Sequence, residues 1–142
     1  MNPAKIRVAI QPGLLSEPLG DLSAVRLMGT RCRICGEVGL GTNPLCLNCG
    51  SDQVAPLRLS SEGEIWTYTV VRHKPPGNYR GPEPFQPFAL GLIELPEGLR
   101  VMAPLAGDPD AVAIGRHVRF HPFVRDDGER QTVSFDFEHV AN

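Results

Sequence analysis

The sequence has no aromatic residue before Trp66, because its single Trp, its two Tyr and its six Phe all lie at or beyond that position. The N-terminal part carries Gly, Pro, Cys and small residues instead, a composition that offers little hydrophobic core of its own. A segment of this kind usually folds with the help of a disulfide, a metal ion or a partner. The lack of aromatic residues before Trp66 therefore predicts a boundary near Leu59, with the parts before and after it folding by different means.

Long hydrophobic runs and an excess of one charge are also missing. No segment approaches the roughly 18 consecutive apolar residues of a membrane span, and MNPAKIRVAIQPG has no continuous apolar region typical of a secretion signal. We therefore expect a cytoplasmic protein without membrane association, in which cysteines stay reduced. The 14 Lys and Arg residues nearly balance the 16 Asp and Glu residues, so the charge does not favour a polyanion-binding protein.

All four cysteines lie in two Cys-x-x-Cys motifs, at Cys32, Cys35, Cys46 and Cys49. Motifs spaced in this way can place four thiolates around one tetrahedral ion, which favours a metal site over a redox dithiol. The predicted ion is Zn²⁺, and iron in a rubredoxin-like centre is the alternative, since it needs the same four thiolates. Four cysteines complete the shell and leave no position for a substrate, so the metal is predicted to be structural.

The segment after Leu59 has the pattern of a small β-barrel. Strands are predicted at 63–73, 88–96, 99–107, 117–124 and 131–140, where β-branched, aromatic and alternating apolar residues gather. In the first strand we expect one face to hold Ile65, Thr67, Thr69 and Val71, and the other to hold Trp66, Tyr68 and Val70. Asp108, Pro109 and Gly115 predict a short helix after the third strand. This order is that of an OB-fold, so the predicted fold is mainly β, with a four-cysteine zinc ribbon before a five-stranded barrel.

Several short motifs occur in a recognisable order, namely LMGTRCRICG, CLNCGS, GEIWTYTVV, PFQPFALGLIEL and IGRHVRF. With these motifs the chain resembles the DUF35 family over roughly residues 26 to 140. The resemblance implies a rubredoxin-like zinc ribbon joined to an acyl-CoA-associated OB-fold. It also implies a non-catalytic accessory subunit whose partner is a thiolase-like enzyme, with a hotdog-fold hydratase or an aldolase as the runner-up, and a CoA thioester as a possible ligand.

The loop after the first barrel strand has residues that suit CoA. OB-folds often bind ligands with this loop, and it carries cations for phosphates and a ring for stacking on a base. The candidate CoA-binding residues are Arg72, His73, Lys74, Tyr79 and Arg80. An ordinary solvated loop whose prolines pack on the barrel is the alternative interpretation.

Three parts are predicted along the chain: a partner-docking segment at 1–25, the zinc ribbon at 26–59 and the OB-fold at 60–142. The docking segment is apolar but has no evident core of its own, so its leucines are candidates for contact with a partner. These residues are Leu14, Leu15, Leu19 and Leu22.

Two other classes of function are considered. Trp66, Tyr68 and Tyr79 beside Arg72 and Lys74 could form a stacking platform for single-stranded nucleic acid, but the balanced charge makes nucleic acid an unfavoured partner. A rubredoxin-like electron carrier would need iron and would not require the barrel. We expect no catalysis by this chain alone, because the four histidines are scattered and all the cysteines are assigned to the metal.

Overall fold

The computed structural model describes residues 6–77, 83–126 and 128–140. The chain forms two compact units. The first unit holds the described residues up to Ser61 together with 96–99 and 122–135, and the second holds 62–95, 100–121 and the end of the chain. Among the helices of the described residues, none is both long enough and apolar enough to cross a bilayer.

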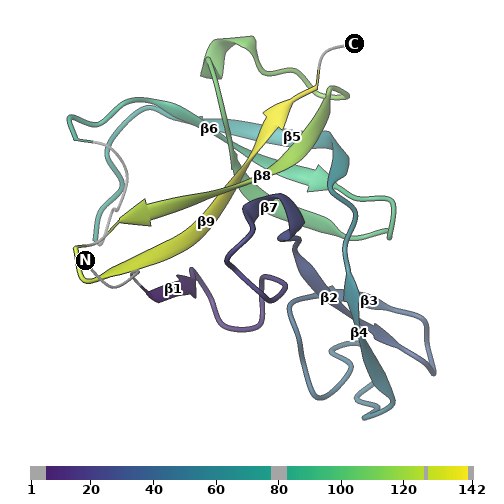
Figure 1. Ribbon diagram of the computed structural model, residues 1–142. Coiled ribbons are helices and arrows are strands. Elements are labelled where there is room, and N and C mark those ends of the chain that lie inside the picture. Colours follow the sequence, from purple (N-terminus) through teal and green to yellow (C-terminus); the bar gives the residue numbers. More distant parts are fainter. Residues whose placement is uncertain (1–5, 78–82, 127, 141–142) are drawn as a thin grey trace. The chain divides into compact units, whose positions relative to one another are not determined.

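A three-stranded antiparallel sheet in the first unit carries the cysteine motifs (Figure 1). Its strands are β2 (Met28–Cys32), β3 (Val38–Leu40) and β4 (Val54–Arg58), with β2 in the centre. The first motif starts at the last residue of β2, and the second lies between β3 and β4. This arrangement brings both motifs to one end of the sheet and confirms the predicted ribbon.

The N-terminal segment is built into the first unit. β1 (Ile6–Ala9) pairs in parallel with β9 through the register Ile6–Arg130 to Ala9–Val133. Further along, Leu15 forms a bridge with Leu27, and the backbone N–H of Met28 donates to the carbonyl of Leu14 at 2.8 Å. Local hydrogen bonds therefore tie this segment to the base of the ribbon.

Burial of the leucines contradicts the interpretation that this segment lacks a core. Leu14, Leu15 and Leu19 are only 7%, 5% and 6% exposed, and Leu22, in the 3-10 helix η1 (Leu22–Ala24), is half-buried. The first three side chains pack inside this chain and present almost no surface to a partner. Composition misled here, because this segment pairs with other parts of the chain, as β1 does with β9 and Leu15 with Leu27.

Five antiparallel and parallel pairings close the predicted barrel (Figure 1). Its strands are β5 (Glu62–Val71), β6 (Phe88–Glu94), β7 (Arg100–Leu105), β8 (His117–Asp126) and β9 (Arg130–His139). β5 pairs with β6 and β8, β6 with β7, and β9 with both β7 and β8. The short helix η2 (Pro109–Ala111) follows β7 with Asp108 as its N-cap, so the predicted OB order is confirmed.

The alternation predicted for the first barrel strand is wrong beyond Ile65. A register shift between Ile65 and Thr67 leaves Trp66 as an extra residue, which is a β-bulge. After the bulge, Tyr68 and Val70 lie opposite Gly91 and Ala89, whose face is buried. Thr67 and Thr69 therefore point outward, and Ile65 shares its face with Tyr68 and Val70.

Gly63 lies where β5 and β6 approach closely. A Cβ atom there would lie 2.7 Å from the backbone oxygen of Glu94 and 2.8 Å from Cγ2 of Ile93. Because the backbone cannot move away cheaply, Gly63→Ala is expected to lower the free energy of unfolding by about 1–3 kcal/mol, measured by urea denaturation. Gly39→Ala is the control, since a Cβ at this strand position meets nothing within 4 Å. Equal losses in both variants would contradict the steric explanation.

Candidate metal centre

The two cysteine motifs fold into nearly identical knuckles. In the first, the N–H groups of Ile34 and Cys35 point at Sγ of Cys32, at 3.4 and 3.5 Å. In the second, the N–H groups of Asn48 and Cys49 point at Sγ of Cys46, both at 3.4 Å. Each knuckle thus presents one sulfur to two backbone donors, an arrangement that favours a thiolate over a thiol.

Glycine makes each knuckle turn possible. Gly36 and Gly50 have φ values of 78° and 79°, a left-handed conformation that other residues adopt at a cost. Their N–H groups donate to the carbonyls of Cys32 and Cys46 at 3.0 and 2.9 Å. The backbone conformation therefore favours glycine after each motif, whatever the cysteine side chains bind.

The four sulfur atoms lie close enough to hold one ion. All four Sγ atoms lie within 4.8 Å of one another, and the pairs Cys32–Cys49 and Cys35–Cys46 are 3.6 Å apart. Two thiolates on a tetrahedral ion with metal–sulfur bonds of about 2.3 Å would be about 3.8 Å apart. The donor set and its spacing therefore fit a tetrahedral metal ion, and the predicted ligands are brought together.

The local hydrogen bonds also separate the pKa values of the cysteines. The N–H of Cys35, assisted by that of Ile34, holds the pKa of Cys32 down to about 6. The N–H of Cys49 lowers the pKa of Cys46 in the same way. At Cys49 a hydrogen bond with the Ser51 backbone lowers the pKa, but the neighbouring sulfur of Cys32 outweighs it, and the pKa rises to about 12. Four thiolates side by side repel one another, so a cation is needed to hold all of them deprotonated.

Two further residues support the knuckles, and no motif in the sequence pointed to them. The side-chain amide of Asn48 donates to Sγ of Cys35 at 3.6 Å. The hydroxyl of Thr30 donates to the carbonyl of Gly41 at 2.7 Å and accepts from the N–H of Asn43 at 3.0 Å. Asn48 is one of the two residues between Cys46 and Cys49, and the spacing rule for metal ligands places no requirement on them, so it could not identify Asn48.

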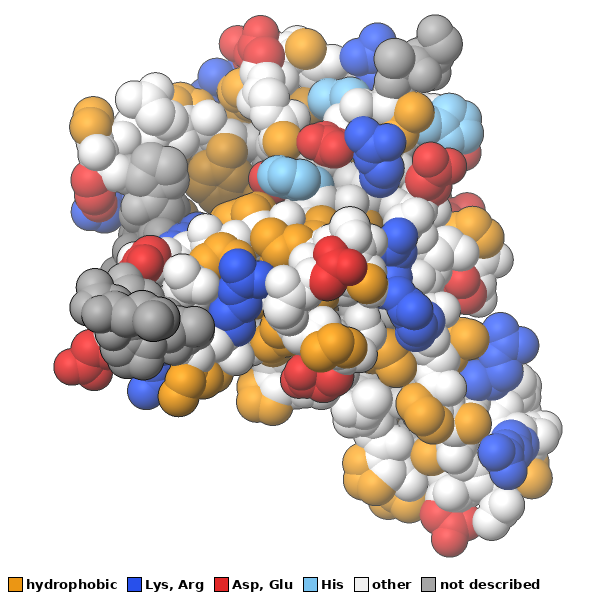
Figure 2. Space-filling view, in the orientation of Figure 1, with side chains coloured by type: hydrophobic (Ala, Val, Ile, Leu, Met, Phe, Trp, Pro, Cys, Tyr) orange, Lys and Arg blue, Asp and Glu red, His pale blue; other side chains and the backbone are white. Residues whose placement is uncertain are grey.

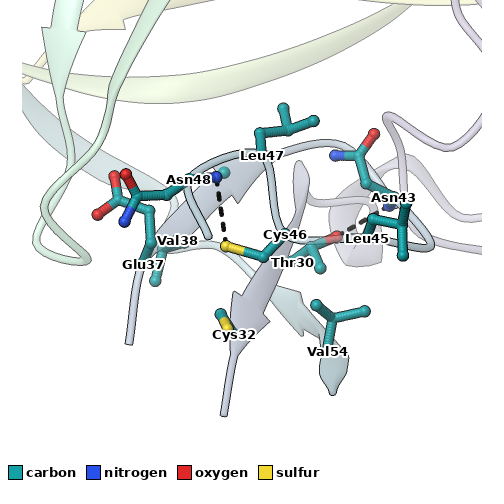
Figure 3. Close-up of a pocket in the computed structure, with 11 residues that line it drawn as sticks. Thr30, Cys32, Glu37, Val38, Asn43, Leu45, Cys46, Leu47, Asn48 and Val54 are labelled. Carbon is teal, nitrogen blue, oxygen red and sulfur yellow. Dashed lines mark hydrogen bonds between the residues drawn. The ribbon is translucent and has the colours of Figure 1, made fainter. Parts of the chain in front are cut away.

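A cavity of about 330 Å³ lies beside the cysteine cluster (Figure 3). Its lining includes the sulfur-bearing residues Cys32 and Cys46, together with Val38, Leu45 and Leu47. Leu45 and Leu47 are 51% and 83% exposed, and hydrophobic side chains are visible on the ribbon surface in Figure 2. Cys32 and Cys46 are buried and Cys35 and Cys49 are exposed, so a metal ion bound by all four would join the inner and outer sides of this end of the ribbon and stabilise it.

In the part of the loop that the structure describes, the candidate CoA-binding cations are paired with carboxylates. Arg72 pairs with Asp110 at 3.0 Å, and Lys74 pairs with Glu83. His73 is exposed. Tyr79 and Arg80 lie outside the described residues. Arg72 and Lys74 therefore both face carboxylates.

Comparisons with known proteins agree with this architecture. Residues 58–121 match the family model described as ChsH2, C-terminal OB-fold domain. A DUF35 domain-containing scaffold protein of Methanothermobacter thermautotrophicus is 30% identical over 79% of this chain and 84% of its own length. The benzoylsuccinyl-CoA thiolase subunit BbsA of Geobacter metallireducens is 27% identical over 92% of this chain and 85% of its own.

A solved structure shows the same fold. It is the Ltp2-ChsH2(DUF35) aldolase, which matches with a TM-score of 0.64 and 28% identity over 82% of this chain and 86% of that one. The likeness spans most of both chains, and the identity to the scaffold protein extends over most of that relative. The cysteine ribbon, the OB barrel and these matches together show that the chain belongs to the DUF35 family.

Proposed function

We propose that this protein is a non-catalytic, zinc-containing accessory subunit of an acyl-CoA-processing complex, with a thiolase-type enzyme as its partner. The observation that carries the proposal is the likeness to a benzoylsuccinyl-CoA thiolase subunit over 92% of the chain. The likeness to the Ltp2-ChsH2(DUF35) aldolase supports the same class of assembly. The partner would own the catalytic residues, and the present chain would help it to fold and to hold its substrate.

The metal centre fits a structural role in such a subunit. Four thiolates fill a tetrahedral shell, so no open position remains where an ion could activate water or a thioester carbonyl. Zn²⁺ bound to Cys32, Cys35, Cys46 and Cys49 would supply structural cross-linking between the two knuckles. The cysteines are then unavailable as nucleophiles, which supports the absence of catalysis by this chain alone.

Binding of CoA by the loop after β5 is part of the proposal. The pairs Arg72–Asp110 and Lys74–Glu83 are exposed to solvent, and such surface pairs contribute at most about 1 kcal/mol. A phosphate group can therefore compete for both cations. Arg72, His73 and Lys74, with Tyr79 and Arg80, would then contact the nucleotide end of the thioester. Single-stranded nucleic acid is not favoured, since it would need a larger surface of unpaired cations.

Co-expression of the tagged chain with its neighbouring reading frames tests the proposal. The expected eluate contains an acyl-CoA enzyme subunit in stoichiometric amount, identified by mass spectrometry, and about one zinc ion per chain by metal analysis. A thiolase-type subunit would also identify the class of reaction. Elution of the chain alone, or together with nucleic acid, would overturn the accessory-subunit proposal and leave the family relationship as a statement about fold.

A further inference from the structure

On the outer side of the sheet of β5, β6 and β7, most residues of β6 and β7 are apolar, whereas β5 contributes Thr67 and Thr69. Residues directly opposite each other in a ladder point to the same side, and the register pairs Leu90 with Pro104 and Leu92 with Met102. The other side of β6 holds Ala89, Gly91 and Ile93, which are buried. We call the part of this side that β6 and β7 supply the outer face; it consists of Leu90, Leu92, Glu94, Arg100, Met102 and Pro104, and Thr67 and Thr69 of β5 border it.

A strand with one face in water normally alternates apolar and polar residues. β6 does not, since Phe88–Ile93 contains no polar side chain. Met102 is 65% exposed, Pro104 is exposed, and Leu90 and Leu92 are half-buried. A central strand that is apolar on both sides is typical of a sheet covered on both sides, so this pattern indicates that a further surface covers the outer face.

The charges at the edge of the outer face restrict the chemistry of the surface that can cover it. The guanidinium of Arg100 lies 3.0 Å from the carboxylate of Glu94 and 3.8 Å from the centre of the Trp66 ring. Its positive charge is therefore matched within the face. Glu64 lies opposite Glu94 in the register and adds a second carboxylate at this edge. An uncharged apolar centre with an acidic edge repels phosphate groups and complements an apolar protein patch that has a basic rim.

From this complementarity we propose that the outer face is the docking surface for the catalytic acyl-CoA enzyme subunit. The inference rests on the proposed function and adds the surface by which the partner is held. The partner would place apolar side chains over Leu90, Leu92, Met102 and Pro104, and a Lys or Arg beside Glu64. Met102, unbranched and adaptable, suits the centre of such an interface.

A matched pair of substitutions tests the proposal. Met102→Glu places a carboxylate in the centre of the outer face, whereas Ile114→Glu makes the same kind of change outside it, at a residue that is 66% exposed against 65% for Met102. The probe is the catalytic subunit that wild-type chain captures on co-expression, and its affinity is measured by titration calorimetry. Met102→Glu is expected to weaken binding by more than about tenfold, because a buried unpaired charge is costly, while Ile114→Glu should bind as wild type.

Melting curves of both variants verify that each is folded, which is expected because exposed substitutions change stability little. Unchanged binding of Met102→Glu, or equal weakening by Ile114→Glu, would overturn the docking surface and leave the proposed function standing. Failure of the wild-type chain to capture any acyl-CoA enzyme subunit would overturn both. A wild-type dimer in light scattering that Met102→Glu dissociates would instead assign the face to a second copy of this chain.

Discussion

Replacement of Cys46 by alanine is expected to abolish stoichiometric metal binding and to unfold the tip of the ribbon. Three thiolates would remain around an open site, and the N–H groups of Asn48 and Cys49 would lose the sulfur that accepts from them. In small zinc domains, metal binding contributes about 10–16 kcal/mol to folding. The loss of one of four ligands should therefore cost several kcal/mol, and the packing of the ribbon cannot replace it.

Metal analysis and amide hydrogen exchange measure the two effects. Cys46→Ala should contain far less than one metal ion per chain, and its amides in β2, β3 and β4 should exchange rapidly. Leu47→Ala is the neighbouring control, because Leu47 is 83% exposed and its side chain is not a ligand. Full metal content together with unchanged protection in Cys46→Ala would contradict a four-cysteine site. Metal analysis of the wild-type chain distinguishes zinc from iron, and an absorption spectrum gives a second test, because a zinc site is colourless and an iron–thiolate centre absorbs visible light.

Truncation of Phe137 is expected to cause the largest loss of stability in the barrel. This side chain is fully buried and meets the ring of Phe120 edge to face, with the ring centres 5.9 Å apart. Phe137→Ala removes the buried ring and leaves a cavity, which typically costs about 3–5 kcal/mol. A domain of ordinary stability has about 5–15 kcal/mol in total, so the variant should unfold at much lower urea concentration than wild type.

The matched control is Phe85→Ala. Phe85 also makes an edge contact, with Phe88 at 6.3 Å between ring centres, but it is only half-buried. Equilibrium urea unfolding followed by fluorescence of Trp66 compares the two variants, and Phe85→Ala should lose much less free energy of unfolding. Similar losses of free energy of unfolding in both variants would contradict the prediction that the buried ring of Phe137 stabilises the barrel more than the ring of Phe85 does.

The cysteine cluster and the order of the barrel strands along the chain were predictable because both depend on local patterns. Ligand spacing within a motif is fixed by the geometry of one turn, so Cys32, Cys35, Cys46 and Cys49 identify the site without knowledge of the rest of the chain. The buried positions of β7, which are Val101, Ala103 and Leu105, follow the alternation in the sequence. The N-cap at Asp108 is likewise a local signal, and the structure confirms it.

Features that depend on distant segments were not predictable in this way. Nothing in the sequence around Ile6–Ala9 indicates that β1 pairs with β9 at the far end of the chain. The burial of Leu14, Leu15 and Leu19 has the same origin. At Trp66 a single bulge shifts the register, so that every later side chain of β5 points to the opposite face from the one predicted. No residue near Trp66 indicates a bulge in the sequence. The apolar outer side of β6 was visible in the sequence, but its position became clear only when the ladder with β7 was known.

The parallel pairing of β1 with β9 has a consequence for how the chain matures during translation. β1 leaves the ribosome well before its partner β9, since Arg7 and Gln131 contact each other across 124 positions. The four cysteines all lie within residues 32–49 and are available long before β9 exists. Nascent chains fold progressively from the N-terminus. Metal loading of the ribbon can therefore precede completion of the barrel, whereas β1 must wait until β9 has been synthesised before it joins its sheet.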